Sequence, residues 1–217
     1  IGLDGITKYP SASLGGFSAT PLEIAGAYTT IAAEGIFTKP RFITKVDQAN
    51  DQSQKIASQS QRFSKATSAW MARDMMVSVM ENGTGTSAKR LGAKGHFAGK
   101  TGTTNAGRDA WFVGMDRDVI TVVWVGFDDN KPLDLTGGQA AIPTWARYSD
   151  WTGGGHYPFL PAPDLKQQSI CLDGSSCAET GHEWARPSSV SKGLGILPGA
   201  MWRQACVVGN STDQNQS

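Results

Sequence analysis

The sequence lacks an excess of charge of either sign and has no long hydrophobic run. Its 217 residues carry a formal net charge of +1, which gives no global attraction to nucleic acid or to an anionic membrane. The longest apolar run, Val119 to Phe127, has the length of a β-strand, whereas a membrane-spanning helix needs about 20 such residues. We therefore expect no nucleic-acid partner, and no membrane-spanning segment within this chain.

Cysteine is scarce and occurs only late in the chain, at Cys171, Cys177 and Cys206. An odd number leaves one thiol over if the other two form a disulfide, and sparse, clustered cysteine slightly favours an oxidising compartment. A zinc site that includes His182 is an alternative, but the spacing matches no familiar set of zinc ligands. The turn signal at Asp173-Gly174 favours Cys171 and Cys177 as the pair, with free thiols as the other alternative. We expect no metal ion and no cofactor.

Helical signals come first along the chain, and strand signals follow. Thr20-Pro21-Leu22-Glu23 is a capping box with proline at the first helical position, which marks the start of a helix. From Gly95 onward, short runs rich in β-branched and aromatic residues indicate strands. The expected elements are a helix over 21–34, a short strand over 39–46, a polar surface loop over 50–61, a helix over 65–82, strands over 97–103, 110–115 and 119–127, and a helix over 139–151 with Pro143 in its first turn.

This order of elements predicts an α+β fold in which helices flank an antiparallel sheet. Asp116-Arg117-Asp118 joins the second and third strands as a hairpin. The third strand is apolar almost throughout, so we expect it to be covered on both faces. Residues 1–151 form the expected domain. Residues 152–217, rich in Gly, Pro and Ser, form the expected tail, which is extended and ordered in places.

The Lys-Thr-Gly segment that begins at Lys100 has the clearest chemistry. Along an ideal strand, Thr101 and Thr103 point to one face and Lys100 to the other. A cation and two hydroxyls suit a carboxylate, Gly102 allows a ligand to approach closely, and the Thr103 N–H is suited to form half of an oxyanion hole. A phosphate-binding loop does not fit, because its first glycine is replaced by Lys94. On this tripeptide alone, a glycine-rich strand without chemistry is the better interpretation.

Ordered blocks on both sides of this segment change that interpretation. They are Ser13-Leu-Gly-Gly, Thr20-Pro-Leu-Glu-Ile-Ala27, Gly83-Thr84-Gly85, Gly99-Lys-Thr-Gly-Thr-Thr-Asn105, Asp109-Ala-Trp-Phe-Val-Gly114 and Val123-Trp-Val-Gly-Phe-Asp-Asp129. Together they closely resemble the class A penicillin-binding proteins, the bifunctional enzymes that polymerise and cross-link peptidoglycan. The resemblance extends from about Tyr9 to Trp151 and does not include the tail.

The resemblance implies the penicillin-recognising serine-enzyme fold, of which this chain is the later part. It also implies a D,D-transpeptidase that works through an acyl-serine, with D-Ala-D-Ala stem peptides and β-lactams as ligands. Such an enzyme is expected at the periplasmic face of the cytoplasmic (inner) membrane, held by an upstream anchor. Asp109 and Trp111 also match the family and are expected to be structural. The implied catalytic residues are Lys100, Thr101 and Thr103, and the implied substrate-binding residues are Gly102, Thr103, Thr104 and Asn105.

Two of the family's three motifs are absent from the places where the family has them. The one Ser-x-x-Lys, Ser189 to Lys192, follows the Lys-Thr-Gly segment instead of preceding it, and no Ser-x-Asn occurs. The chain also begins at Ile1 without methionine. We therefore expect the nucleophile in an upstream segment of the same protein, and we expect this chain alone to be inactive. The alternatives are a D,D-carboxypeptidase, a serine β-lactamase, and a non-catalytic β-lactam sensor or scaffold on the same fold.

Overall fold

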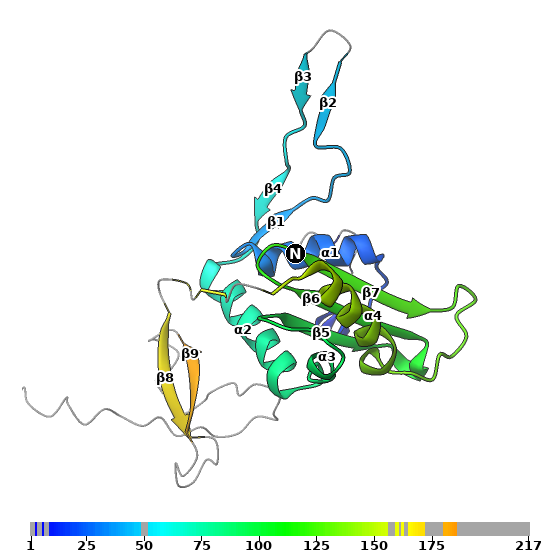
Figure 1. Cartoon of the computed structure of the whole chain (residues 1–217), viewed down its shortest axis with the longest axis vertical. Helices are drawn as coiled ribbons and strands as arrows, with labels where there is room; N and C mark the ends of the chain where they lie inside the picture. The colour runs from blue at the N-terminus through cyan, green and yellow to red at the C-terminus, as the bar shows by residue number, and fades with distance from the viewer. Residues whose placement is uncertain are drawn as a thin grey trace, which may run out of the picture. The chain divides into compact units, whose positions relative to one another are not determined.

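The computed structural model describes residues 3, 6, 9–48, 52–155, 159, 160, 162, 165–171 and 180–185. The chain divides into two compact units, Ile1–Phe159 and Leu160–Ser217. The first unit contains the helices, a three-stranded sheet and two small two-stranded sheets, and the second contains one two-stranded sheet (Figure 1). Among the described helices, none is long and apolar enough to cross a membrane.

Two of the helices begin at capping boxes. The Glu23 N–H donates to Thr20 Oγ1 at 3.2 Å and the Thr20 N–H donates to Glu23 Oε2 at 2.7 Å, which confirms the predicted start of α1. A second capping box, between Thr136 and Gln139, starts α4. The helical elements are η1 (Pro10–Leu14), α1 (Pro21–Ala32), α2 (Ala66–Asn82), α3 (Ser87–Arg90), η2 (Asn105–Gly107) and α4 (Gly137–Thr152).

The predicted start of the last helix is wrong by two residues. Helix α4 begins at Gly137, so Pro143 lies in its second turn and not in its first. The pair Gly137-Gly138 conceals this start, because glycine is a poor helix former. The preceding threonine still fixes the start, because its hydroxyl accepts the N–H of Gln139 at 3.3 Å.

The main sheet has the three antiparallel strands that the sequence predicts. In the turn between the second and third strands, Asp116 Oδ1 accepts the N–H groups of Asp118 at 2.8 Å and Val119 at 2.7 Å, which confirms the expected hairpin. The strand order is β5-β6-β7. The strands are β5 (Ala98–Thr103), β6 (Asp109–Met115) and β7 (Ile120–Gly126).

Helices pack on both faces of this sheet. On one face, the Trp145 ring of α4 meets the rings of Phe97 and Phe112 edge to face, with centroids 5.0 Å apart in both pairs. Gly114 leaves room for this indole, because a Cβ at residue 114 would lie 2.2 Å from Trp145 Cε2. On the other face, Met115 packs with residues of α1 and α2. Partly buried residues of strand β7 pack against both clusters, but Trp124 is exposed, so the expected cover on both faces is only partial.

The predictions of a strand over 39–46 and of a loop over 50–61 are wrong. An arm carries two short sheets in this region, in which β1 pairs with β4 and β2 pairs with β3 (Figure 1). Pro40 has no N–H to donate and lies between the two strands of the outgoing half of the arm. The strands are β1 (Ile36–Thr38), β2 (Lys45–Asp47), β3 (Ser53–Lys55) and β4 (Ser60–Arg62).

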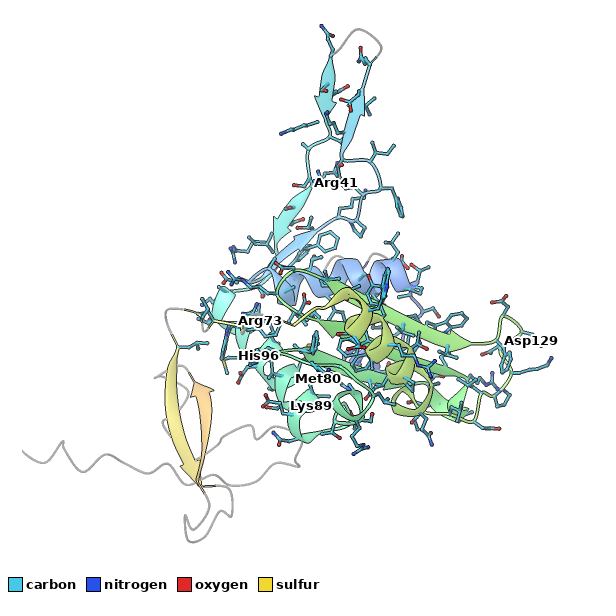
Figure 2. The ribbon with its side chains drawn as sticks, viewed as in Figure 1. Arg41, Arg73, Met80, Lys89, His96 and Asp129 are labelled. Atoms are coloured by element: carbon cyan, nitrogen blue, oxygen red, sulfur yellow. The ribbon has the colours of Figure 1, made fainter. Side chains whose placement is uncertain are left out.

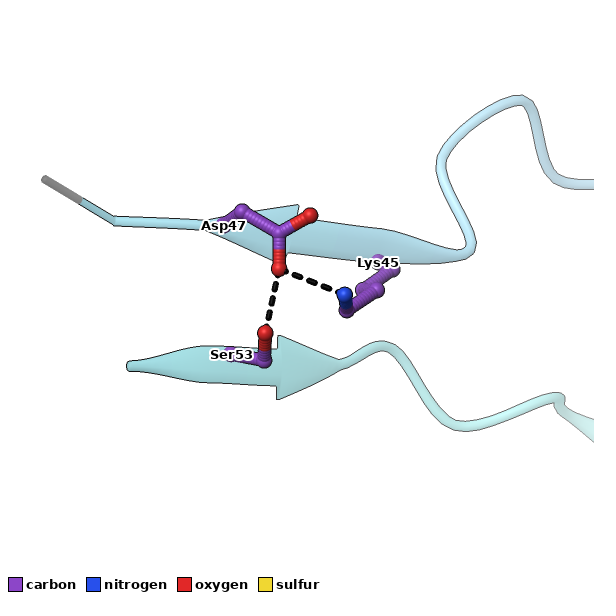
Figure 3. Close-up of polar contacts among 3 residues, drawn as sticks. All are labelled: Lys45, Asp47 and Ser53. Carbon is purple, nitrogen blue, oxygen red and sulfur yellow. Dashed lines mark hydrogen bonds and ion pairs between the residues drawn. The ribbon is translucent and has the colours of Figure 1, made fainter. Parts of the chain in front are cut away.

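The outer part of the arm, β2 and β3, is held by polar contacts and not by a core, whereas at the base of the arm the rings of Phe37 and Phe63 meet edge to face. Every residue of β2 and β3 is exposed, so no alternation of buried and polar residues marks these strands in the sequence. Arg41 Nη1 donates to the Ile56 carbonyl oxygen at 2.6 Å, across the middle of the arm (Figure 2). Asp47 accepts a hydrogen bond from Ser53 and forms an ion pair with Lys45 at 2.7 Å (Figure 3).

The second unit contains the hairpin of β8 (Lys166–Cys171) and β9 (Thr180–Ala185). The expectation of an extended tail over 152–217 stays a prediction. Cys177 and Cys206 lie outside the described residues, as do Ser189 and Lys192. The disulfide and the interpretation of Ser-x-x-Lys therefore stay predictions, as does a domain boundary after residue 151.

Candidate active site

The Lys-Thr-Gly segment lies at an edge of the described sheet, where β5 pairs with β6 alone. The Thr104 N–H donates to the Asp109 carbonyl oxygen at 3.1 Å and therefore faces β6. Because these groups alternate in direction along an antiparallel strand, the N–H groups of Thr101 and Thr103 face the open edge. The Lys100 side chain is exposed, and its Nζ donates to the Thr101 carbonyl oxygen at 2.7 Å. A cation and two backbone donors thus gather along this edge.

The register of the sheet separates the two threonine side chains from the lysine. Thr101 is paired with Phe112, which contacts Trp145 of α4, and Thr103 lies two residues further along β5 on the same face. Lys100 is paired with Val113 on the opposite face. The alternation predicts Lys100 on this other face, and since its Nζ bonds the outward carbonyl of Thr101, the side chain reaches the open edge from there.

A third threonine, Thr84, joins this cluster from the loop after α2. Its Oγ1 lies 3.0 Å from Thr101 Oγ1, and either hydroxyl can be the donor. The sequence predicts only a tight loop here, although Gly83-Thr84-Gly85 is one of the blocks that match the class A family. This match to the family is the one feature of the sequence that points to the loop, and it assigns no role to the Thr84 hydroxyl.

The first turn of α4 covers the end of the segment. The Gly137 N–H donates to Thr103 Oγ1 at 3.1 Å. A Cβ at residue 137 would lie 2.3 Å from the Trp111 carbonyl oxygen and 2.6 Å from that of Gly102, so only glycine allows this approach. The positive end of the helix dipole therefore adds to the potential of Lys100 around the threonine hydroxyls. Local sequence patterns could not reveal a contact between residues so far apart.

Thr104, an expected substrate-binding residue, is hydrogen-bonded within the protein. Its Oγ1 donates to Asp109 Oδ2 at 3.0 Å and accepts the Asp109 N–H at 2.9 Å. Asp109 Oδ1 accepts Trp124 Nε1–H at 2.9 Å, which agrees with the structural role expected of Asp109. Asn105 is exposed in the turn that follows. The assignment of Thr104 and Asn105 to substrate binding stays a prediction.

The arrangement can bind an anion and stabilise negative charge that develops beside it. Hydroxyl groups of Thr101 and Thr103 are donors for a carboxylate, and the outward Thr103 N–H can donate to an oxyanion. Within the described ranges, no three His, Cys, Asp or Glu side chains gather as metal ligands. The same ranges contain neither a Ser-x-x-Lys nor a Ser-x-Asn, so the site as described has hydrogen-bond donors for an anion but no activated nucleophile.

Comparison with known families and proteins gives consistent matches. The family model described as the penicillin binding protein transpeptidase domain matches residues 6–147. Penicillin-binding protein 1B of Vibrio cholerae is 36% identical over 152 residues, which are 68% of this chain and 19% of that protein. Penicillin-binding protein 1B of Escherichia coli K12 is 33% identical over 183 residues, which are 82% of this chain and 21% of that protein. The chain thus spans about a fifth of the length of these curated relatives.

Solved structures share the fold. Penicillin-binding protein 1A from Haemophilus influenzae matches with a TM-score of 0.70 and 22% identity, over 83% of this chain and 34% of that one. The PonA1 protein from Mycobacterium tuberculosis, solved in complex with penicillin V, matches with a TM-score of 0.59 and 26% identity. That match covers 73% of this chain and 45% of the PonA1 chain.

Proposed function

The chain belongs to the penicillin-binding protein transpeptidase family, and on that premise we propose that it is the substrate-binding part of a peptidoglycan D,D-transpeptidase. Lys100, Thr101 and Thr103 carry the proposed catalytic and carboxylate-binding roles, with Gly102, Thr104 and Asn105 as further substrate contacts. The nucleophilic serine belongs to an upstream segment of the same protein. The fold is the α+β fold of this family.

One observation carries the proposal. The Lys100 ammonium group and the outward N–H of Thr103 lie at the open edge of β5, beside the strand face that carries the hydroxyls of Thr101 and Thr103. A terminal carboxylate accepts hydrogen bonds only, so it is matched by hydroxyl donors beside a cation. The backbone N–H at the same edge suits the oxygen of the carbonyl group under attack.

The proposed reaction is acyl transfer in two steps. The serine oxygen attacks the carbonyl carbon of the penultimate D-Ala, the oxyanion forms against the Thr103 N–H, and the terminal D-Ala leaves as an amine that takes up a proton. The amine of a second stem peptide then attacks the acyl-serine, loses a proton and releases the serine. A β-lactam acylates the same serine, but its leaving amine stays covalently linked to the acyl group after the ring opens.

The proposed partners and location follow from the same family. Penicillin V is the ligand in the PonA1 structure, and we extend β-lactam binding to this protein as part of the proposal. The D-Ala-D-Ala stem peptides of peptidoglycan are the proposed substrates. The proposed location is the periplasmic face of the cytoplasmic membrane, with contact to the lipid made by an anchor outside this chain.

The test uses the complete protein with a fluorescent penicillin and with pentapeptide-bearing peptidoglycan precursors. We expect a long-lived adduct on one upstream serine, together with cross-linked dimers that penicillin abolishes. Rapid turnover of penicillin would identify a β-lactamase, and release of D-Ala without dimers a carboxypeptidase. A stable adduct with neither product would identify a sensor, and any of these three results overturns the proposed transpeptidase.

A further inference from the structure

Thr84 lies in the loop between α2 and α3, 3.0 Å from Thr101 when the two Oγ1 atoms are compared. Two elements far apart in the sequence thus share a hydrogen bond at the edge proposed to bind the substrate carboxylate. Thr84 itself is exposed and Thr101 is half-buried, so a ligand can reach the pair. Nothing in the proposed function requires a hydroxyl at residue 84.

The position of Thr84 is fixed by the packing of its loop. The Gly85 N–H donates to the Val79 carbonyl oxygen at 3.0 Å, and Gly85 is buried. Met80 of α2 lies between this loop and β5 (Figure 2), because a Cβ at Gly85 would lie 2.7 Å from its Sδ and a Cβ at Gly99 2.5 Å from it. The approach of α2 to β5 therefore brings the backbones of the two threonines close enough for their hydroxyls to meet.

The donor and acceptor capacity of a hydroxyl determines how Thr84 can act on Thr101. A hydroxyl has one hydrogen and two acceptor lone pairs, whereas a carboxylate can only accept. Thr103 accepts the Gly137 N–H, so its own hydrogen remains available for a ligand. The hydrogen of the Thr101 hydroxyl is likewise available for a ligand only if Thr84 is the donor in the bond between the two threonines.

We propose that Thr84 is a positioning residue for the acylation reaction: its hydroxyl donates to Thr101 Oγ1 and so directs the Thr101 hydrogen toward the carboxylate of the bound acyl donor. This inference rests on the proposed function, because it assigns the partner of Thr101 in that site. Thr84 and Gly137 then have parallel tasks. Each occupies a lone pair of one threonine and leaves that threonine as a donor to the ligand.

The test compares Thr84→Val, which removes the hydroxyl at nearly equal volume, with Thr84→Ser, which keeps it, in the complete protein. The second-order rate constant of acylation by a peptide thioester with a free terminal carboxylate is measured beside that for its methyl ester. For the acid, we expect Thr84→Val to lower the rate about threefold to tenfold, the factor of one net hydrogen bond. Thr84→Ser should stay within about twofold of wild type, and the ester should react equally with both variants.

Two further variants separate positioning from damage to the fold. Thr86→Val alters the same loop at a threonine whose side chain makes no cap hydrogen bond, and it should react like wild type with both compounds. Thr84→Ala removes the hydroxyl without adding a methyl group and should match Thr84→Val. In a Thr101→Val background, Thr84→Val should have no further effect on the acid, because the two residues act through one bond.

The possible failures are distinguishable. If the wild-type protein is acylated but Thr84→Val and Thr84→Ala equal Thr86→Val, the inference is wrong and the proposed function stands. The inference also fails if the acid and the ester slow down together, because that pattern indicates a general disturbance of the site. If penicillin and both thioesters leave wild type unmodified, the proposed function itself is wrong, and the role of Thr84 falls with it.

Discussion

The backbone N–H of Gly137 donates to the hydroxyl of Thr103 across 3.1 Å and ties the first turn of α4 to the Lys-Thr-Gly strand. The same helix carries Trp145, which packs on Phe97 and Phe112 in the core of the sheet. One helix thus joins the centre of the hydrophobic core to the edge where substrate is proposed to bind. The geometry of that edge should therefore depend on how closely the start of α4 approaches the strand.

Gly137→Ala should impair both stability and acylation, because its Cβ would lie 2.3 Å from the Trp111 carbonyl oxygen. Gly138→Ala is the matched control: its Cβ would have no heavy atom nearer than 3.7 Å, and alanine favours the helix by about 0.5–1 kcal/mol. We expect a lower melting temperature and slower penicillin acylation for the first variant only. Equal melting temperatures and rates for the two variants would contradict the close approach of α4.

Lys100→Ala in the complete protein should sharply lower the rate of β-lactam acylation without unfolding it. Its side chain is exposed, so little packing is lost, whereas removal of one well-placed electrostatic group costs about 2.7–4 kcal/mol in the transition state. Stopped-flow acylation with a fluorescent penicillin measures the effect, and Lys94→Ala, an exposed lysine of the preceding loop, serves as the control. If both variants react like wild type, Lys100 has no part in the reaction.

Asp74 should make the protein less stable as pH rises. Burial, together with the negative charge of Glu81, raises the pKa of Asp74 above its ordinary 3.8. The folded protein then binds this proton more tightly than the unfolded chain, so stability is greatest below pH 3.8 for this group and is lost as pH rises through the folded pKa. We expect Asp74→Asn to raise the urea midpoint at neutral pH and to flatten this part of the pH profile. Glu81→Gln should act in the same direction but more weakly, and an unchanged midpoint in Asp74→Asn would refute the assignment.

The sequence alone predicts the structure correctly where contacts between residues close together in the chain determine it. Thr20 and Glu23 fix the start of α1 by contacts three residues apart, and Asp116 closes the hairpin between β6 and β7 within its own turn. Strand alternation also places Thr101 and Thr103 on one face. Such features depend on neighbours in the chain, so patterns within a short window contain the information.

The rest depends on contacts between distant segments. Strands β2 and β3 of the arm have no buried face, so their pairing leaves no periodic signal in the sequence. Thr84 meets Thr101 only because α2 packs against β5, and Gly137 meets Thr103 only because α4 returns to the sheet. Glycines at residues 85, 99 and 137 permit these approaches. In the sequence, however, they indicate flexibility as readily as close packing.

The chain by itself should form no covalent adduct with penicillin. Its one Ser-x-x-Lys follows the Lys-Thr-Gly segment, and glycines follow it where the start of a buried helix is needed. Without a lysine or other base to remove its proton, a serine hydroxyl is a weak nucleophile, so the proposed binding groups around Lys100 are not sufficient for acylation. Intact-mass spectrometry of the purified chain after incubation with penicillin is the measurement, with the complete protein as the positive control.

The described sheet gives a second reason to expect that an upstream segment is needed. In the part of the chain that the structure describes, β7 pairs with β6 alone, and an apolar edge strand invites pairing with another chain. We therefore expect the isolated chain to associate with itself, and co-expression with an upstream segment of the same protein to yield a soluble complex that penicillin acylates on the upstream part. A stable monomer of this chain that gains one penicilloyl group, mapped to Ser189 or to any other of its serines, would overturn this account of where the nucleophile lies.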